Sequence, residues 1–115
     1  MTVHIYGIAN CDTIKKARKW LLEHQIDYVF HDYKKEGVDS DALQRWSQQA
    51  GWESLLNKRG TTWRKLPDSD KESLDETKAL ALLTEHTSMI KRPVLLLDEG
   101  VYIGFSASSY EALFL

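Results

Sequence analysis

The chain has 115 residues, of which 43% are hydrophobic and 28% charged, and its formal net charge is −2. This length suits one globular domain, and the composition is that of a soluble protein rather than a disordered or membrane-spanning one. The small negative charge gives no general attraction to nucleic acid or to anionic lipid, so we expect neither as a partner. A strand pattern follows Met1 directly, so we expect no secretory signal and a cytoplasmic location. We also expect the chain to be a monomer.

The N-terminal part of the chain predicts a β-α-β unit. Residues 2–6 alternate between apolar and polar side chains, which is typical of a short strand. From residue 12 to about residue 24, apolar side chains recur at helical spacing. A second alternating stretch, made by Ile26, Tyr28 and Phe30, has the period of a half-buried strand.

About residues 38–90 predict a helical insertion. One helix is expected to begin at Asp39 or Ser40 and to end at Gly51, because these are residues that commonly cap helices. Short helices and loops are expected over residues 52–75, where apolar residues are scattered among polar ones. Helical spacing returns over residues 75–87.

The C-terminal part predicts a hairpin and a final helix. Pro93 can open a strand over residues 94–97, and a turn at residues 98–100 leads to a second strand. The last helix is expected to begin at Ser106 or Ser108, with Ser108 and Glu111 as a capping box. The order β-α-β, helical insertion, β-β-α predicts an α/β protein with a thioredoxin-like fold and a mixed four-stranded sheet. We expect residues 1–115 to form a single domain.

Cys11 is the only cysteine, and it lies where the first predicted strand leads into the first helix. Unpaired amides and the helix dipole at such a position favour a reactive thiolate, and Lys15 can add to this effect. The alternative is that Cys11 is a small buried hydrophobic residue. Because no second cysteine completes a C-x-x-C pair, any mixed disulfide needs an external thiol, for which glutathione is the candidate.

Two motifs carry a resemblance to a known family: Arg92-Pro93-Val94, and near the N-terminus Ile5-Tyr6-Gly7-Ile8-Ala9-Asn10-Cys11-Asp12-Thr13. With them the chain resembles the arsenate reductase (ArsC) family, closest to its YffB and Spx-like branch, over essentially its whole length. The resemblance implies that Cys11 is catalytic, that the Arg92–Pro93 bond is cis beside it, and that Arg92 faces an anionic substrate. The further residues expected to bind substrate or glutathione are Asn10, Thr13, Lys15, Lys58, Arg59 and Pro93.

The chain also departs from the glutaredoxin-coupled arsenate reductases of this family. Where those enzymes have a histidine before the cysteine, this chain has Gly7, and their serine beyond the cysteine falls near Ile14. Two of their three oxyanion-binding arginines are missing here, at positions that fall near Asn57 and Phe105. Tight oxyanion binding calls for several fixed donors that converge on one point. We therefore rank a glutathione-dependent thiol or disulfide reductase above an arsenate reductase, with glutaredoxin as a second candidate partner.

A third interpretation is a non-catalytic, Spx-like regulator that binds RNA polymerase. Spx-type sensing usually relies on a C-x-x-C pair, and Ile14 stands where its second cysteine would be. This interpretation is therefore ranked lower. The four histidines show no metal-ligand spacing with one another or with Cys11, so we expect no metal and no bound cofactor, with glutathione acting as a co-substrate.

Overall fold

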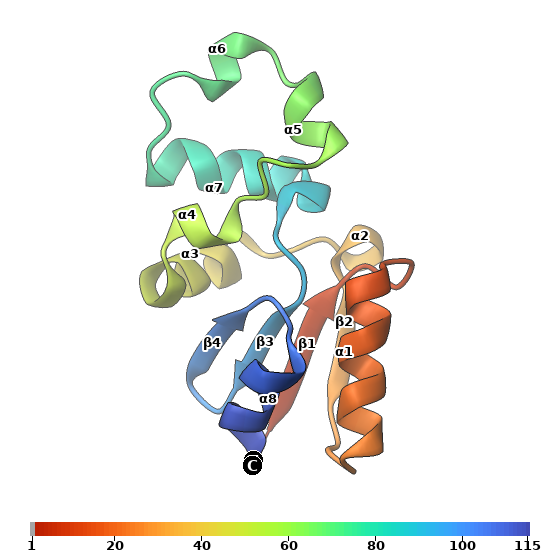
Figure 1. The fold of residues 1–115 in the computed structure, drawn as a ribbon. Helices are drawn as coiled ribbons and strands as arrows, with labels where there is room; N and C mark the ends of the chain where they lie inside the picture. Colours follow the sequence, from red (N-terminus) through yellow and green to blue (C-terminus); the bar gives the residue numbers. More distant parts are fainter. Residues whose placement is uncertain (1) are drawn as a thin grey trace. The chain divides into compact units, whose positions relative to one another are not determined.

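The computed structural model describes residues 2–115, which divide into two compact units. The first unit combines the N-terminal segment up to Glu36 with Arg92–Leu115, and the second consists of Gly37–Lys91. Figure 1 shows the helices and strands of both. Within residues 2–115 no helix is both long enough and apolar enough to cross a membrane.

A mixed sheet of four strands forms the centre of the first unit (Figure 1). Its strands are β1 (Val3–Gly7), β2 (Val29–Asp32), β3 (Val94–Leu97) and β4 (Gly100–Ile103), in the order β2-β1-β3-β4. β1 runs parallel to β2 and antiparallel to β3, which in turn runs antiparallel to β4. The predicted mixed sheet of a thioredoxin-like fold is therefore confirmed.

The register of β1, β2 and β3 brings three separate chain segments to one end of this sheet. Gly7 pairs with Asp32 where the parallel strands β1 and β2 both end. Tyr6 pairs with Val94 where the antiparallel strand β3 begins. The loop after β1, the residues that follow β2 and the residues that precede β3 consequently meet at the same end of the sheet.

Two helices, α1 (Asp12–Glu23) and α8 (Ala107–Phe114), cover one face of the sheet (Figure 1). The core between sheet and helices consists of Val3, Ile5 and Leu95 from the strands, Ala17, Trp20 and Leu21 from α1, and Tyr110 from α8. The ring of Tyr110 meets Trp20 and Phe105 edge-on, with centroids 5.5 and 4.7 Å apart. Edge-to-face pairs of this kind add to the stability that apolar burial provides.

The second strand begins later than its alternating pattern predicts. β2 begins at Val29, because the backbone before it makes the hydrogen bonds that end α1. Gln25 takes a left-handed conformation with φ 57°, and the amide of Ile26 donates to the carbonyl of Leu21 at 2.9 Å. Ile26 therefore belongs to the end of the helix, although its side chain still packs against the core.

The start of the last helix also differs in detail. The hydroxyl of Ser106 accepts a hydrogen bond from the amide of Ser109 at 3.0 Å, and the Ser109 hydroxyl oxygen accepts one from the amide of Ser106 at 3.1 Å. These two residues form the capping box, so the expectation of Ser108 and Glu111 was wrong. Ser106, Ser108 and Ser109 can all cap a helix, and the position at which the helical backbone begins determines which of them contacts the free amides.

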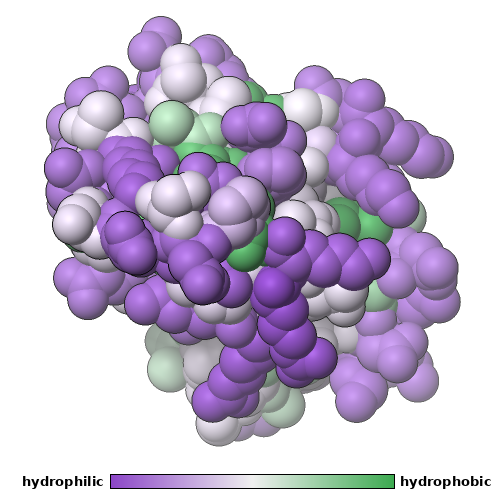
Figure 2. All heavy atoms as spheres, turned by 90° about the horizontal axis from the view of Figure 1, so that it is seen from above, coloured by the Kyte–Doolittle hydropathy of each residue, from purple (hydrophilic) through white to green (hydrophobic). Residues whose placement is uncertain are grey.

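The second unit is helical. Its elements are α3 (Ser40–Ala50), α4 (Trp52–Leu55), α5 (Thr61–Lys65), α6 (Asp68–Lys71), α7 (Glu76–Glu85) and a 3₁₀ turn, Thr87–Met89. The predicted helices and the short helices between them are confirmed. Within this unit an antiparallel bridge pairs Leu56, which follows α4, with Ile90, which follows the 3₁₀ turn, and both residues are buried. The face drawn in Figure 2 consists mostly of hydrophilic residues, with small, separate hydrophobic areas.

Gly7 allows an unusually close approach between the end of β1 and the first turn of α1. A Cβ atom at this position would lie 2.0 Å from Cδ1 and 2.6 Å from Cγ1 of Ile14. Ile14 is itself fully buried, so its side chain has little room to turn away. The start of α1 can therefore lie against the strand end only because position 7 has no side chain.

We predict that Gly7→Ala lowers the free energy of unfolding by about 1–3 kcal/mol, because it overpacks the core. Urea denaturation measures this loss. Ile14→Ala removes both clashing atoms, so it should cost less stability in the Gly7→Ala background than in the wild-type chain. Losses that simply add in the double variant would show that the contact with Ile14 is not the cause.

Candidate active site

Cys11 occupies the position just before α1, with an extended backbone (φ −130°, ψ 128°). Its carbonyl accepts the first hydrogen bond of the helix, from the amide of Lys15 at 2.9 Å. The side chain is partly buried and partly open to solvent. As predicted from the sequence, the sulfur thus lies at the amino end of a helix of 12 residues, where amides and the helix dipole favour negative charge.

Opposing effects act on the pKa of the Cys11 thiol. Partial burial raises this pKa, whereas the amide of Ile14, the side chain of Arg92 and the amide of Thr13 lower it by hydrogen bonding, with help from the charge of Arg92. The lowering effects are together the larger, so the pKa lies below its ordinary value. The thiol makes no ideal capping hydrogen bond, yet these donors favour its thiolate form, which is the nucleophilic one.

Arg92 reaches the sulfur from the segment that precedes β3. Its side chain donates hydrogen bonds both to Cys11 and to the phenol oxygen of Tyr33. The peptide bond between Arg92 and Pro93 is cis, as the family resemblance implied, and Pro93 is buried. The structure therefore brings together Cys11, Thr13 and Arg92 from the set of residues chosen on the sequence.

Tyr33 was not singled out by the sequence, although it belongs to this cluster. It is the first residue of α2 (Tyr33–Glu36), directly after β2, and its side chain is only 1% exposed. Burial raises the pKa of its hydroxyl well above the usual range, and the hydrogen bond and charge of Arg92 only partly oppose this. The phenol is consequently neutral at physiological pH.

Asp32 is the second residue that sequence reasoning missed. Its buried carboxylate accepts hydrogen bonds from the amides of Lys34 at 3.0 Å, Lys35 at 3.4 Å and Ala9 at 3.4 Å. The first two bonds cap α2, and the third ties this helix to the loop that leads to Cys11. An aspartate at the end of the second strand was the available signal, because the ends of parallel strands lie side by side.

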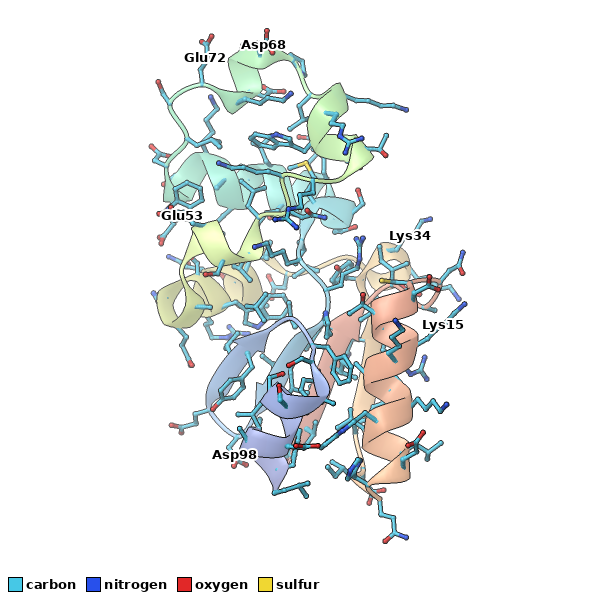
Figure 3. The ribbon with its side chains drawn as sticks, viewed as in Figure 1. Lys15, Lys34, Glu53, Asp68, Glu72 and Asp98 are labelled. Atoms are coloured by element: carbon cyan, nitrogen blue, oxygen red, sulfur yellow. The ribbon has the colours of Figure 1, made fainter. Side chains whose placement is uncertain are left out.

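Four further predicted binding residues, Asn10, Lys15, Lys58 and Arg59, are exposed. Asn10 lies in the turn before Cys11, and Lys15 extends from the first part of α1. Figure 3 shows Lys15 and Lys34 at the end of the first unit where α1 and α2 begin, whereas Asp98 of the β3–β4 turn lies at the opposite end. Lysine side chains are thus present at the end of the sheet that carries Cys11.

Lys58 and Arg59 belong to the second unit, in the segment between α4 and α5, and both are exposed. The ammonium of Lys58 lies 5.6 Å from the ring centroid of Trp63. The carbonyl of Arg59 accepts a hydrogen bond from the guanidinium of Arg64 at 3.0 Å. These contacts order the segment locally, and a part for Lys58 and Arg59 in binding glutathione stays a prediction.

We predict that Arg92→Ala raises the pKa of Cys11, because it removes a hydrogen bond and a positive charge from the sulfur. The rate of Cys11 alkylation by iodoacetamide, measured against pH, should have a midpoint below that of an ordinary cysteine thiol in the wild-type chain and a higher midpoint in the variant. Lys19→Ala is the control for loss of a positive charge, since that exposed lysine pairs with Glu23 at 3.7 Å. An unchanged midpoint in Arg92→Ala would show that Arg92 does not act on the sulfur.

Comparison with known proteins places this geometry in a family. The sequence model of the ArsC family matches residues 6–113. An uncharacterized protein of Haemophilus influenzae is 48% identical over 112 residues, which cover 97% of this chain and 98% of that protein. The global transcriptional regulator Spx 2 of Bacillus cereus is 32% identical over 90% of this chain and 80% of its own length. The solved structure of the YFFB protein matches with a TM-score of 0.96 and 49% identity, covering 99% of this chain and 100% of that one. The resemblance based on the two motifs is confirmed, and the chain belongs to the ArsC family.

Proposed function

We propose that this chain is a glutathione-dependent thiol or disulfide reductase of the cytoplasm, with Cys11 as its nucleophile. One observation carries the proposal: the partly exposed sulfur is surrounded by donors that lower the pKa of its thiol. Thiol–disulfide exchange requires an accessible thiolate of this kind. A cysteine kept only for packing would be buried in apolar surroundings, which raise the thiol pKa.

The simplest cycle uses a mixed disulfide between a substrate thiol and glutathione. The Cys11 thiolate attacks the glutathione sulfur, so that a bond forms between Cys11 and glutathione while the substrate leaves as a thiolate and takes a proton from water. The thiolate of a second glutathione then attacks the bound glutathione sulfur, which releases Cys11 and oxidised glutathione. In sum, the mixed disulfide and one glutathione are converted into the substrate thiol and glutathione disulfide. An external thiol completes the cycle because Cys11 is the only cysteine.

The residues around Cys11 suit a ligand that carries carboxylates. Arg92 and the amides of Thr13 and Ile14 act on the sulfur itself. Exposed Lys15 offers a further positive charge one turn along α1, where it can attract a carboxylate of glutathione. We include Asn10, Pro93, Lys58 and Arg59 among the residues that would contact glutathione or the substrate.

The contact between Gly7 and Ile14 weighs against arsenate as the main substrate. Family arsenate reductases carry a histidine and a serine at or near these two positions. Here both positions are apolar and in close contact, and a side chain at position 7 would collide with Ile14. Two of the donors that would support an arsenate-binding thiolate are thus replaced by a hydrophobic contact. Arg92 alone remains of the three family arginines, which leaves few fixed donors for an oxyanion.

The similarity to Spx 2 supports a second candidate, a regulator that binds RNA polymerase. The position where Spx-type sensing would need a second cysteine is Ile14, whose side chain is fully buried in the apolar face of α1. Redox sensing by an internal disulfide is therefore not available to this chain. We rank the regulator below the reductase.

We predict that Cys11→Ser abolishes the glutathione-dependent reduction of a small mixed disulfide, because a serine hydroxyl is not a nucleophile toward disulfides at neutral pH. Product formation is followed through the glutathione disulfide released. Thermal unfolding of the variant should stay close to that of the wild-type chain, which excludes misfolding as the cause. Reductase activity that persists in Cys11→Ser would refute the proposal.

A protection experiment separates the candidate functions. Glutathione disulfide should block the alkylation of Cys11, whereas arsenate at the same concentration should not. Protection by arsenate alone would favour an arsenate reductase. A chain that is protected by neither, and that retains RNA polymerase subunits in stoichiometric amounts, would favour the regulator.

A further inference from the structure

We propose that Tyr33 is a positioning residue for Arg92: its buried phenol holds the guanidinium against Cys11 without cancelling the positive charge. The inference rests on the proposed function, because it takes Cys11 as the reacting group. It assigns a role to a buried polar side chain that the cycle above does not use.

The hydrogen bonds of Arg92 restrict how its guanidinium can lie. Its side chain donates to the phenol oxygen of Tyr33 and to the sulfur of Cys11. A guanidinium is planar and its donors are fixed relative to one another, so an acceptor at a second position limits how the group can turn. Without Tyr33, the long and partly exposed side chain of Arg92 would sample other rotamers and leave the sulfur part of the time.

Tyr33 is itself rigidly held. It is 1% exposed and begins α2, directly after the edge strand β2. Asp32 fixes this turn, because its carboxylate accepts from the amides of Lys34 and Lys35 at 3.0 and 3.4 Å. The same carboxylate also accepts from the amide of Ala9 at 3.4 Å, in the loop before Cys11. The carboxylate of Asp32 therefore anchors both the helix that carries Tyr33 and the loop that leads to Cys11.

A neutral phenol also leaves the positive charge of Arg92 uncompensated. A carboxylate that accepted from Arg92 would neutralise most of its charge and would repel both a thiolate and an anionic ligand. A phenol orients the guanidinium equally well and stays neutral, since burial raises the pKa of Tyr33 far above physiological pH. The positive charge of Arg92 consequently remains available to the Cys11 thiolate.

The chain offers a matched control in Tyr110. Both tyrosines are 1% exposed and lie in the first unit. Within residues 2–115, however, the hydroxyl of Tyr110 is buried without a hydrogen-bond partner, whereas that of Tyr33 accepts from Arg92. Tyr110→Phe therefore removes the same buried atom without any effect on the cluster at Cys11.

The test compares Tyr33→Phe with Tyr110→Phe in the full chain, with the pH dependence of Cys11 alkylation by iodoacetamide as the readout. In Tyr33→Phe we expect a higher midpoint and a rate that is about two- to tenfold lower at pH values below it, which corresponds to a pKa rise of about 0.3 to 1. In Tyr110→Phe the profile should match that of the wild-type chain. In an Arg92→Ala background, Tyr33→Phe should cause no further change, since Tyr33 acts through Arg92.

Three results would overturn the inference: an unchanged midpoint in Tyr33→Phe, an equal shift in Tyr110→Phe, or a full additional shift in the Arg92→Ala background. Circular dichroism and thermal unfolding check that each variant folds, and Tyr33→Leu provides a second variant with the same expected shift. Alkylation requires no turnover. A chain without reductase activity that still shows the Tyr33→Phe shift would therefore refute the proposed function and leave the role of Tyr33 intact.

Discussion

The pairing register of β1 with its two neighbours is the constraint on which the rest of the site depends. Parallel pairing aligns Gly7 with Asp32, and antiparallel pairing aligns Tyr6 with Val94. Residues that lie far apart in the sequence are thereby delivered to one end of the sheet. A slip of one residue along either strand would turn its buried side chains to the other face, so burial of the core fixes this alignment. The same apolar contacts that stabilise the first unit therefore also assemble the groups around the sulfur.

Both arginines of the first unit donate a hydrogen bond to a tyrosine hydroxyl. Arg92 donates to the phenol of Tyr33, and Arg18 of α1 donates to the phenol of Tyr28 at 3.1 Å while lying 4.2 Å from the ring centroid of Phe30. Aromatic rings and phenols can orient a guanidinium without forming an ion pair. For Arg18 the result is a contact that joins α1 to the segment leading into β2. For Arg92 it is a cation whose charge still acts on the thiol.

Periodicity in the sequence predicted the strands, the long helices and the mixed sheet, because each of these buries a regular stripe of apolar residues. Cys11 could be found from its place between a strand and a helix, and Arg92 from its motif. Asp32 and Tyr33 could not be found in this way. A helix of four residues is too short to show a period, and the role of both residues depends on the register between strands, which no single segment encodes. The capping box was misassigned because Ser106, Ser108 and Ser109 offer the same chemistry within one turn.

The close approach of Gly7 to Ile14 implies that these two positions are not free to change independently during evolution. A larger side chain at position 7 needs a smaller one at position 14, and a change at either position alone passes through a clash or a cavity. Tolerated changes at these positions should therefore come in pairs, with a loss of volume at position 14 accompanying any gain at position 7.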